Sequence, residues 1–157
     1  MDKTSDGANV RFPPPLIYVA GLAFGIAAER FLKFPTLGLP PVPRDLAGSL
    51  LVLIGFLLML AGAGLFLRRR TAILPFKPAS TLVTSGVLSW TRNPMYLGMA
   101  VFYAGLAVVL NSLVALVLLP LVLAIVQTQV IAREEAYLER AFGDEYVAYK
   151  NRVGRWI

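Results

Sequence analysis

The chain has 157 residues, of which 57% are hydrophobic and 15% charged, whereas a soluble domain usually carries about 25% charged residues, so we expect lipid to surround much of it. Its net charge of +6 indicates cationic loops facing an anionic membrane leaflet, and we expect no nucleic-acid partner because no basic face with interleaved aromatics occurs. The absence of cysteine and histidine excludes disulfides and the most common general base, and it argues against any metal cofactor.

Four apolar segments predict an all-α fold, namely a multi-pass transmembrane helical bundle in one integral-membrane domain that covers residues 1–157. The spans are expected at about residues 16–34, 46–67, 95–110 and 113–131. The second carries no charge over 22 residues, or about 33 Å of helix, which crosses a bilayer core of about 30 Å. Only Asn111 and Ser112 separate the last two spans, which predicts a tight antiparallel hairpin.

Glycines recur within the predicted spans. Gly21 and Gly25 stand four residues apart, on one face of the first helix. Others in the second and third spans are Gly55, Gly62, Gly64, Gly98 and Gly105. Small residues let helices approach closely, so we interpret these positions as packing sites, with room for a ligand between helices as the alternative.

Loop charges predict the orientation of the chain. Residues 68–94 contain five basic residues and no acidic one, and the tail over residues 133–157 contains five more basic residues. The positive-inside rule places both segments on the cytoplasmic side. With four spans, the N- and C-termini are then both cytoplasmic.

The tail is expected to be helical rather than a further span. Leu138, Phe142, Tyr146 and Tyr149 recur at helical spacing, and Gly143 before Asp144 predicts a helix end followed by a new start. The aromatic stripe is typical either of a helix lying on the membrane surface or of a functional face.

The stretch "TRNPMYLG" at residues 91–98 opens the third span. Pro94 suits the first turn of a helix, and Asn93 before it is expected to cap that helix by accepting a backbone N–H. Arg92 adds a full charge beside the positive end of the helix dipole. The arrangement predicts a site for a carboxylate or phosphate, with a capped helix and a snorkelling arginine as the alternative.

Two adjacent acids, Glu134 and Glu135, follow the fourth span directly. They are typical either of a solvated helix end or of a polar site beside the membrane. Their side chains point about 100° apart around a helix, so we favour Glu134 over Glu135 as the acid with a catalytic role.

Together these two regions resemble a known family. "TLVTSGVLSWTRNPMYLG" and "REEAYLERAFGDEYVAYKNRV" resemble the isoprenylcysteine carboxyl methyltransferase family, which belongs to a wider group with the phospholipid methyltransferases. The resemblance covers residues 81–157. It implies S-adenosylmethionine as the cofactor, without a glycine-rich strand–loop–helix motif, and a lipophilic or lipidated substrate reached from membrane lipid.

Individual residues are expected to have roles at this site, and the resemblance implies those that bind the cofactor. Arg92 and Glu134 are expected to be catalytic, and Arg133 and Glu135 to contact substrate. The implied cofactor-binding residues are Ser80, Thr81, Leu82, Val83, Asn93, Pro94, Met95, Tyr96 and Glu134.

The chain departs from the family pattern at two positions. Asn93 stands where eukaryotic members have histidine, and Val130 stands where they have a substrate-contacting arginine. Gln127, Thr128 and Gln129, with the nearby Arg133, are candidates to take over that arginine's role. These departures leave the methyl acceptor open, and the sequence does not set the oligomeric state.

The residue inventory favours one type of acceptor. A carboxylate nucleophile is ionised at neutral pH and needs no base, whereas an amine must first lose a proton to Glu134 or Glu135. We therefore expect carboxyl O-methylation of an isoprenylcysteine-like acceptor. The alternatives are N-methylation of phospholipid ethanolamine head groups, a non-enzymatic membrane scaffold, and a membrane reductase that uses a nicotinamide cofactor.

Overall fold

The computed structural model describes residues 8, 10, 13–69 and 79–157. Its elements are α1 Pro14–Leu32, α2 Pro41–Arg68, the 3-10 helix η1 Gly86–Ser89, α3 Pro94–Val109, α4 Leu113–Val126, the π-helix η2 Gln127–Ile131, α5 Ala132–Phe142 and α6 Asp144–Arg152. No strand occurs among these described residues, so the prediction of an all-α fold is confirmed.

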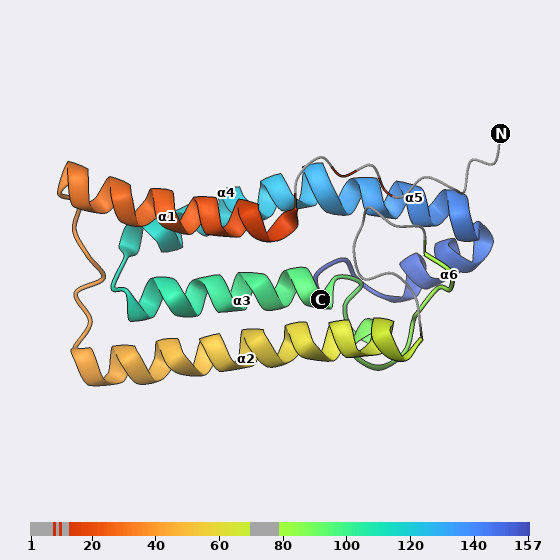
Figure 1. Ribbon diagram of the computed structural model, residues 1–157, viewed down its shortest axis with the longest axis horizontal. Helices are drawn as coiled ribbons and strands as arrows, with labels where there is room; N and C mark the ends of the chain where they lie inside the picture. Colours follow the sequence, from red (N-terminus) through yellow and green to blue (C-terminus); the bar gives the residue numbers. More distant parts are fainter. Residues whose placement is uncertain (1–7, 9, 11–12, 70–78) are drawn as a thin grey trace.

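The long helices lie side by side and divide the molecule into a bundle and an end region. Figure 1 shows α1 and α4 above α3, with α2 below, and the turn between α3 and α4 at the left-hand end. At the right-hand end, α5 extends beyond the other helices, and α6 and the chain that leads into α3 gather beside it. This end therefore brings the chain before α3 next to α5 and α6, which lie far from it in the sequence.

Three helices are long and apolar enough to cross a membrane: α1, α2 and the continuous helix Leu113–Phe142. They agree with three of the four predicted spans. The remaining predicted span, at about residues 95–110, corresponds to α3, which is apolar but has 16 residues, or about 24 Å of helix. The count of four spans and the cytoplasmic position of the tail therefore stay predictions.

The predicted border between the last span and the tail is not a helix end. The helix continues from α4 through η2 into α5, over 30 residues in all. At 1.5 Å per residue it is roughly 45 Å long, which exceeds a bilayer core of about 30 Å. The acids near its end can therefore lie on the same helix as the span and still lie outside the core.

Helices α2 and α3 pack along a glycine seam, which we define as Gly48, Gly55 and Gly62 on α2 with Gly98 and Gly105 on α3. A Cβ atom at Gly55 would lie 2.5 Å from the backbone nitrogen of Phe102 and 2.6 Å from the carbonyl oxygen of Gly98. Backbone atoms cannot move aside as a side chain can, so glycine is required there. The packing interpretation is confirmed along this seam, whereas Gly64 faces open space.

The seam also places the start of α3 beside the end of α2. A Cβ at Gly62 would lie 2.9 Å from Met95 and 3.3 Å from Pro94, so Gly62 packs on the first turn of α3. One turn further along α2, Phe66 lies close to the same part of α3, because it lines a cavity together with Pro94 and Met95. The glycine spacing therefore fixes which part of α2 lies next to the "TRNPMYLG" stretch.

Helix α1 packs on α4 at small residues and at one buried acid. A Cβ at Gly25 would lie 2.6 Å from Cα of Ala115, so the two helices nearly touch. Glu29 is 9% exposed and accepts hydrogen bonds from Ser112 Oγ at 2.9 Å and from the backbone N–H of Val114 at 3.0 Å. This acid thus accepts one backbone N–H and one hydroxyl at the start of α4, and it does not line the pocket of the end region.

Candidate active site

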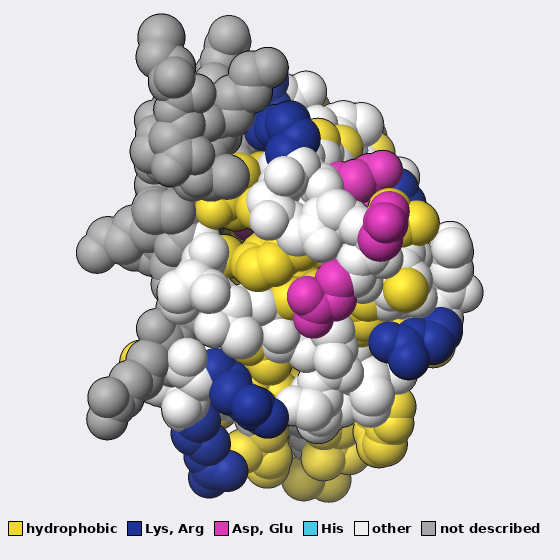
Figure 2. All heavy atoms as spheres, turned by 90° about the vertical axis from the view of Figure 1, so that its right-hand side faces the viewer, with side chains coloured by type: hydrophobic (Ala, Val, Ile, Leu, Met, Phe, Trp, Pro, Cys, Tyr) yellow, Lys and Arg dark blue, Asp and Glu magenta, His cyan; other side chains and the backbone are white. Residues whose placement is uncertain are grey.

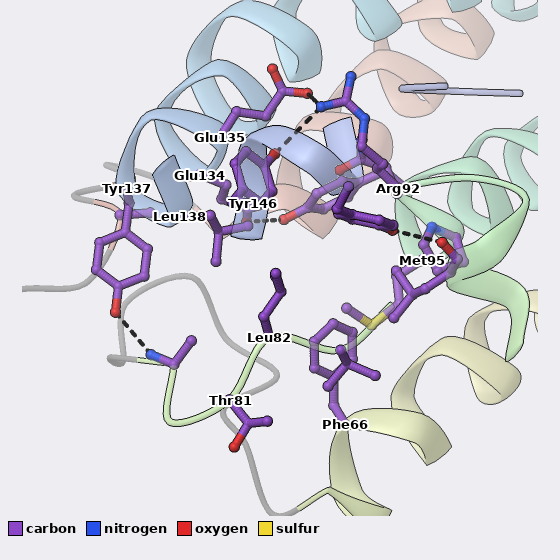
Figure 3. Close-up of a pocket in the computed structure, with 18 residues that line it drawn as sticks. Phe66, Thr81, Leu82, Arg92, Met95, Glu134, Glu135, Tyr137, Leu138 and Tyr146 are labelled. Carbon is purple, nitrogen blue, oxygen red and sulfur yellow. Dashed lines mark hydrogen bonds and ion pairs between the residues drawn. The ribbon is translucent and has the colours of Figure 1, made fainter. Parts of the chain in front are cut away.

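A pocket lies in the end region, between elements that the sequence separates widely. Its walls come from the end of α2, residues 79–88, the start of α3, and helices α5 and α6. Figure 3 shows side chains from all of these elements directed toward one space. The lining residues are Ala8, Phe66, Ala79, Thr81, Leu82, Val83, Leu88, Arg92, Asn93, Pro94, Met95, Tyr96, Glu134, Glu135, Tyr137, Leu138, Tyr146 and Tyr149.

Most of the residues predicted to bind a cofactor meet in this pocket. Thr81, Leu82 and Val83 line it, as do the four residues from Asn93 to Tyr96 and Glu134. Ser80 is exposed and is not among the lining residues. Of the two residues predicted to contact substrate, Glu135 lines the pocket and Arg133 does not. The individual roles stay predictions.

The start of α3 differs in one respect from expectation. Pro94 is the first residue of the helix and Asn93 takes the N-cap position, as predicted. The prediction that the Asn93 side chain caps the helix is wrong, because its amide nitrogen donates instead to the carbonyl oxygen of Arg155, at 2.9 Å. The side chain therefore ties the motif to the segment after α6.

Arg92 is held by groups from two other helices. Its Nη1 lies 3.0 Å from Glu135 Oε1 of α5 and donates to the hydroxyl of Tyr146 of α6 at 3.4 Å. The Arg92 and Glu135 side chains are only 9% and 10% exposed. Among described residues, the buried Nε of Arg92 has no hydrogen-bond partner. This guanidinium therefore keeps one unsatisfied donor within the described part of the chain.

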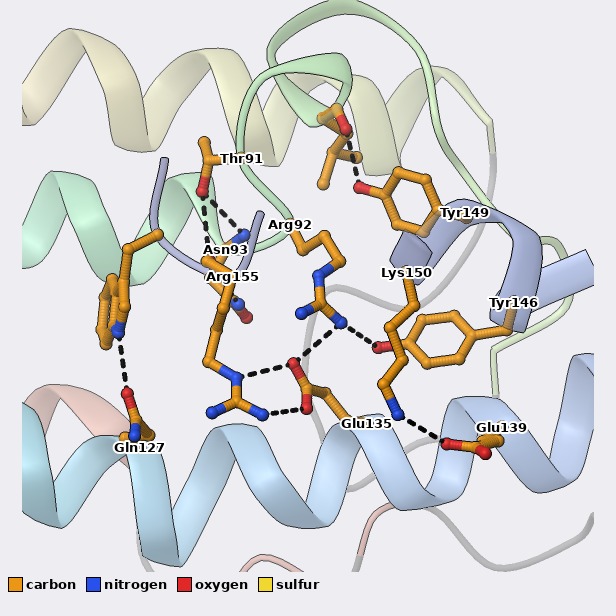
Figure 4. A network of polar contacts seen from close by, with 12 residues as sticks. Thr91, Arg92, Asn93, Gln127, Glu135, Glu139, Tyr146, Tyr149, Lys150 and Arg155 are labelled. Carbon is orange, nitrogen blue, oxygen red and sulfur yellow. Dashed lines mark hydrogen bonds and ion pairs between the residues drawn. The ribbon is translucent and has the colours of Figure 1, made fainter. Parts of the chain in front are cut away.

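Glu135 also binds a second arginine. Arg155 donates from Nε to Oε1 of Glu135 at 2.9 Å and from Nη2 to Oε2 at 2.6 Å. These hydrogen bonds raise the pKa of Arg155. Figure 4 shows the carboxylate of Glu135 between the two guanidinium groups. Glu135 is therefore not a solvated helix end, and it has little accepting capacity left for substrate.

Glu134 has a different neighbour from Glu135. It accepts a hydrogen bond from the hydroxyl of Tyr96 in the first turn of α3. The backbone carbonyl of Tyr96 in turn accepts from Tyr18 of α1 at 3.0 Å. Tyr96 thus joins the pocket to the bundle, and it leaves the second oxygen of Glu134 as an acceptor. Both acids line the pocket, and the preference for Glu134 over Glu135 as the functional acid stays a prediction.

Further tyrosines brace the wall of the pocket. Tyr149 donates to the carbonyl of Leu88 at 2.7 Å, and Tyr137 accepts from the backbone N–H of Ala79 at 2.9 Å. Burial raises the pKa of Tyr146 to about 12 and that of Tyr149 to about 12. Both phenols therefore stay neutral at physiological pH. Within the aromatic stripe of the tail, Tyr146 and Tyr149 therefore face the protein interior, whereas Phe142 is only partly buried.

The π-helix η2 lies directly before the acidic pair. A π-turn inserts an extra residue into a helix, and such turns often occur at functional sites. Gln127 at its start accepts from the ring N–H of Trp156 at 2.9 Å, whereas Thr128 is exposed and bonds to its own helix. Neither residue nor Gln129 lines the pocket, so the suggestion that this run replaces a substrate-binding arginine gains no support.

Sequence reasoning missed several residues of the site. Phe66, Leu88 and Tyr137 line the pocket, and Arg155 and Thr91 hold residues that do. The helical spacing of the tail indicated Tyr146 and Tyr149, which also line the pocket, but none of these five residues. Arg155 stands in no pattern that indicates its partner, because that partner lies 20 residues earlier in the sequence.

Charged side chains at this end of the molecule fall into an exposed set and a buried set. Figure 2 views it face-on, with basic side chains spaced around the edge and acidic ones between them. Arg140, Arg152, Glu139 and Asp144 are exposed there. Arg92 and Glu135 are not, which separates the buried ion pairs of the pocket from the solvated charges of the surface.

The pocket offers a donor, an acceptor and apolar walls within one space. The free Nε of Arg92 suits an anionic group, Glu134 suits a cationic one, and Leu82, Val83 and Leu138 suit an apolar or aromatic body. No cluster of metal-ligating side chains occurs in the part of the chain that the structure describes. Fold and site together define a helical protein with spans apolar enough to cross a membrane and with a pocket lined by an arginine, two acids and apolar side chains.

The chain belongs to the phospholipid methyltransferase family, whose model matches residues 43–145. That range contains α3, α4, α5, all but the first two residues of α2, and every residue of the pocket wall except Ala8, Tyr146 and Tyr149. It ends before most of α6 and before Arg155.

Two relatives with methyltransferase names also match part of the chain. The chain is 39% identical over 72 residues to the protein-S-isoprenylcysteine O-methyltransferase of Schizosaccharomyces pombe and 41% identical over 73 residues to that of Saccharomyces cerevisiae. Each match covers 46% of this chain and 30% of the relative, so the chain matches less than a third of these relatives' length. An uncharacterized protein of Haemophilus influenzae is 55% identical over 47 residues, which are 30% of this chain and 73% of that protein.

Proposed function

We propose that this chain is a membrane methyltransferase that uses S-adenosylmethionine to methylate a lipophilic acceptor, by carboxyl O-methylation of an isoprenylcysteine-like group. The observation that carries the proposal is the meeting of Arg92, Tyr96 and Glu134 with apolar side chains in one pocket. Membership of the phospholipid methyltransferase family and the names of the yeast relatives support it.

The pocket residues fit the charged part of this cofactor. S-Adenosylmethionine supplies an already activated methyl group on a sulfonium, together with a carboxylate and an ammonium. Arg92 Nε would bind the carboxylate, and the free oxygen of Glu134 would bind the ammonium or face the sulfonium charge. The α3 N-terminus adds backbone N–H groups that have no partner within the helix.

The apolar lining residues would hold the rest of the cofactor. Leu82, Val83 and Leu138 would cover its adenine, and Met95 and Phe66 close the side next to the bundle. Water is excluded by these residues, which strengthens every charge–charge contact inside. Holding acceptor and donor in one orientation is the main task left to the protein.

Whether Glu134 or Glu135 can take up a proton decides which kind of methyl acceptor the pocket suits. A carboxylate acceptor needs no base, and Glu135 is already bound by Arg92 and Arg155. An amine acceptor would need Glu134 to take a proton while Tyr96 donates to it. N-Methylation of a phospholipid ethanolamine group is the second candidate, favoured by the description of the matching family.

Two measurements on the detergent-solubilised chain test the proposal. S-Adenosylhomocysteine should raise the thermal midpoint, because a ligand that binds only the folded state stabilises it, and NADPH should not. Methyl-labelled cofactor should then label a farnesylcysteine analogue rather than phosphatidylethanolamine vesicles. No midpoint shift at millimolar S-adenosylhomocysteine would favour the scaffold, and a shift with NADPH would favour the reductase.

Orientation is tested with single cysteines, because the native chain has none. Cysteines that replace Arg69 and Gly143 should react with an impermeant reagent from the cytoplasmic face. A cysteine at Ser112 should react from the opposite face, with denaturant needed because Ser112 is buried. Labelling of positions 69 and 143 from opposite faces would contradict the proposed topology.

A further inference from the structure

The segment from Gly154 to Trp156, which follows α6, lies against the loop that leads into α3. The backbone N–H of Arg92 donates to the carbonyl of Gly154 at 3.0 Å, and Asn93 Nδ2 donates to the carbonyl of Arg155 at 2.9 Å. The hydroxyl of Thr91 donates to that same carbonyl at 3.3 Å. Figure 4 shows the Arg155 backbone beside Thr91 and Asn93 while its side chain reaches α5.

The Arg155 side chain does not line the pocket, yet it binds a residue that does. It holds both oxygens of Glu135, whose Oε1 also pairs with Arg92. The three side chains carry a net charge of +1 when all are present. Without Arg155, the pair Arg92–Glu135 is neutral and offers less attraction to an anion.

We propose that Arg155 is a positioning residue for ligand binding. By holding Glu135 with two hydrogen bonds, it fixes the acid that orients Arg92 and keeps the cluster positive, so that Arg92 Nε is available to a ligand carboxylate. This inference rests on the proposed function, since it names Arg92 as the group that binds the carboxylate of S-adenosylmethionine.

A double-mutant cycle with Arg155→Gln and Arg92→Gln tests the inference on the detergent-solubilised full chain. Calorimetry with S-adenosylhomocysteine should show about a tenfold loss of affinity for Arg155→Gln, roughly one charge-assisted contact. The same substitution should change affinity less than twofold once Arg92 is Gln, because Arg155 acts through Arg92. Equal losses in both backgrounds would overturn the inference.

Control variants separate position from charge. Arg152→Gln removes one positive charge from an exposed residue nearby and should leave affinity unchanged. Arg155→Lys keeps the charge but lacks the two-pronged geometry, so its affinity should fall between those of wild type and Arg155→Gln. A loss for Arg152→Gln as large as that for Arg155→Gln would mean that only the general field matters.

Tryptophan fluorescence shows whether Arg155→Gln releases the segment from Gly154 to Trp156 from the loop before α3. Trp156 is partly buried, and the other tryptophan, Trp90, is 79% exposed and is replaced by Phe for this test. Acrylamide quenching of Trp156 should be unchanged by Arg155→Gln, because the backbone bonds of Arg155 and the Trp156–Gln127 bond remain. Quenching that rises together with the loss of affinity would overturn the positioning role in favour of a structural one.

A ligand-free cycle separates this inference from the proposed function. In unfolding experiments, Arg155→Gln should lower the thermal midpoint more when Arg92 is also Gln, because Glu135 then loses both partners. If that double variant does not fold, Arg155→Gln is compared in a Glu135→Gln background, where it should have little effect. Failure of wild type to bind S-adenosylhomocysteine would refute the proposed function, whereas absent coupling in unfolding would refute the link through Glu135.

Discussion

Between the helices of the bundle, α2 and α3 meet at glycines, whereas in the end region α3, α5 and α6 meet through charged groups and hydroxyls. The seam at Gly55 leaves no room for a methyl group, and its contacts are backbone atoms. The pocket wall is instead joined by pairs such as Arg92–Glu135 and Tyr149–Leu88. Lipid gives helices little hydrophobic reason to associate, so close packing holds the bundle and polar bonds hold the pocket.

The largest expected effect comes from filling the seam. Gly55→Ala places a methyl group where backbone atoms of α3 lie at 2.5 and 2.6 Å, so the helices must move apart. We expect the free energy of unfolding to fall by about 3 kcal/mol, measured by denaturant unfolding in detergent.

Gly64→Ala is the matched control, because Gly64 lies on the same helix and a Cβ there meets nothing within 4 Å. It should stabilise α2 by up to about 1 kcal/mol through helix propensity. Equal destabilisation by both substitutions would contradict the assignment of the seam.

The second largest effect is a loss of ligand affinity, which we expect from variants in the pocket. Glu134→Gln removes the negative charge beside Tyr96 and should weaken S-adenosylhomocysteine binding ten- to a hundredfold, or roughly 1.5–3 kcal/mol. Tyr96→Phe should also weaken it. The control variant Glu139→Gln changes an exposed acid about one turn away and should bind S-adenosylhomocysteine normally. Normal binding by Glu134→Gln would refute the assignment of Glu134.

A matched pair of tyrosines sharpens the comparison. Tyr149 donates to the Leu88 carbonyl in the end region, and Tyr103 donates to the Ala115 carbonyl at 2.9 Å within the bundle. Each change to Phe removes a hydrogen bond from a buried carbonyl and should lower stability by about 1–2 kcal/mol.

Only Tyr149→Phe should also weaken ligand binding, because Leu88 lines the pocket and Ala115 does not. Thermal midpoints and calorimetry on both variants give the answer. If Tyr103→Phe weakened binding as much, the bundle and the end region would not be separable in function.

The smallest expected effect concerns the surface of the end region. Lys150 and Glu139 form an ion pair at 3.1 Å, with side chains that are 38% and 46% exposed. Exposed pairs contribute little, so Lys150→Gln should change the free energy of unfolding by less than about 0.5 kcal/mol. A larger loss in thermal unfolding would mean that surface charge, and not the buried pairs, holds α6 in place.

The bundle was predictable because its signals are local. Apolar length predicted α1, α2 and α4, and Pro94 predicted the start of α3. The glycine packing on α2 and α3 also followed from the residues themselves, although the partner of each glycine did not.

The pocket was predictable only through resemblance, and in part wrongly. Resemblance brought Leu82, Tyr96 and Glu134 together, but physical reasoning assigned Asn93 a capping bond that it does not make. Which acceptor binds its amide, and which guanidinium binds Glu135, depend on how α6 folds back. Periodicity along a sequence carries no information on such distant partners.

The most direct test of the central claim is photocrosslinking of labelled S-adenosylmethionine to the detergent-solubilised chain, followed by peptide mapping. The account predicts that the label attaches within residues 79–96 or 134–149 and that excess S-adenosylhomocysteine suppresses it. Glu134→Gln should reduce the labelling and Glu139→Gln should not. Label confined to α1 or to the first half of α2, or no competed label at all, would contradict the claim that the end region is the cofactor site.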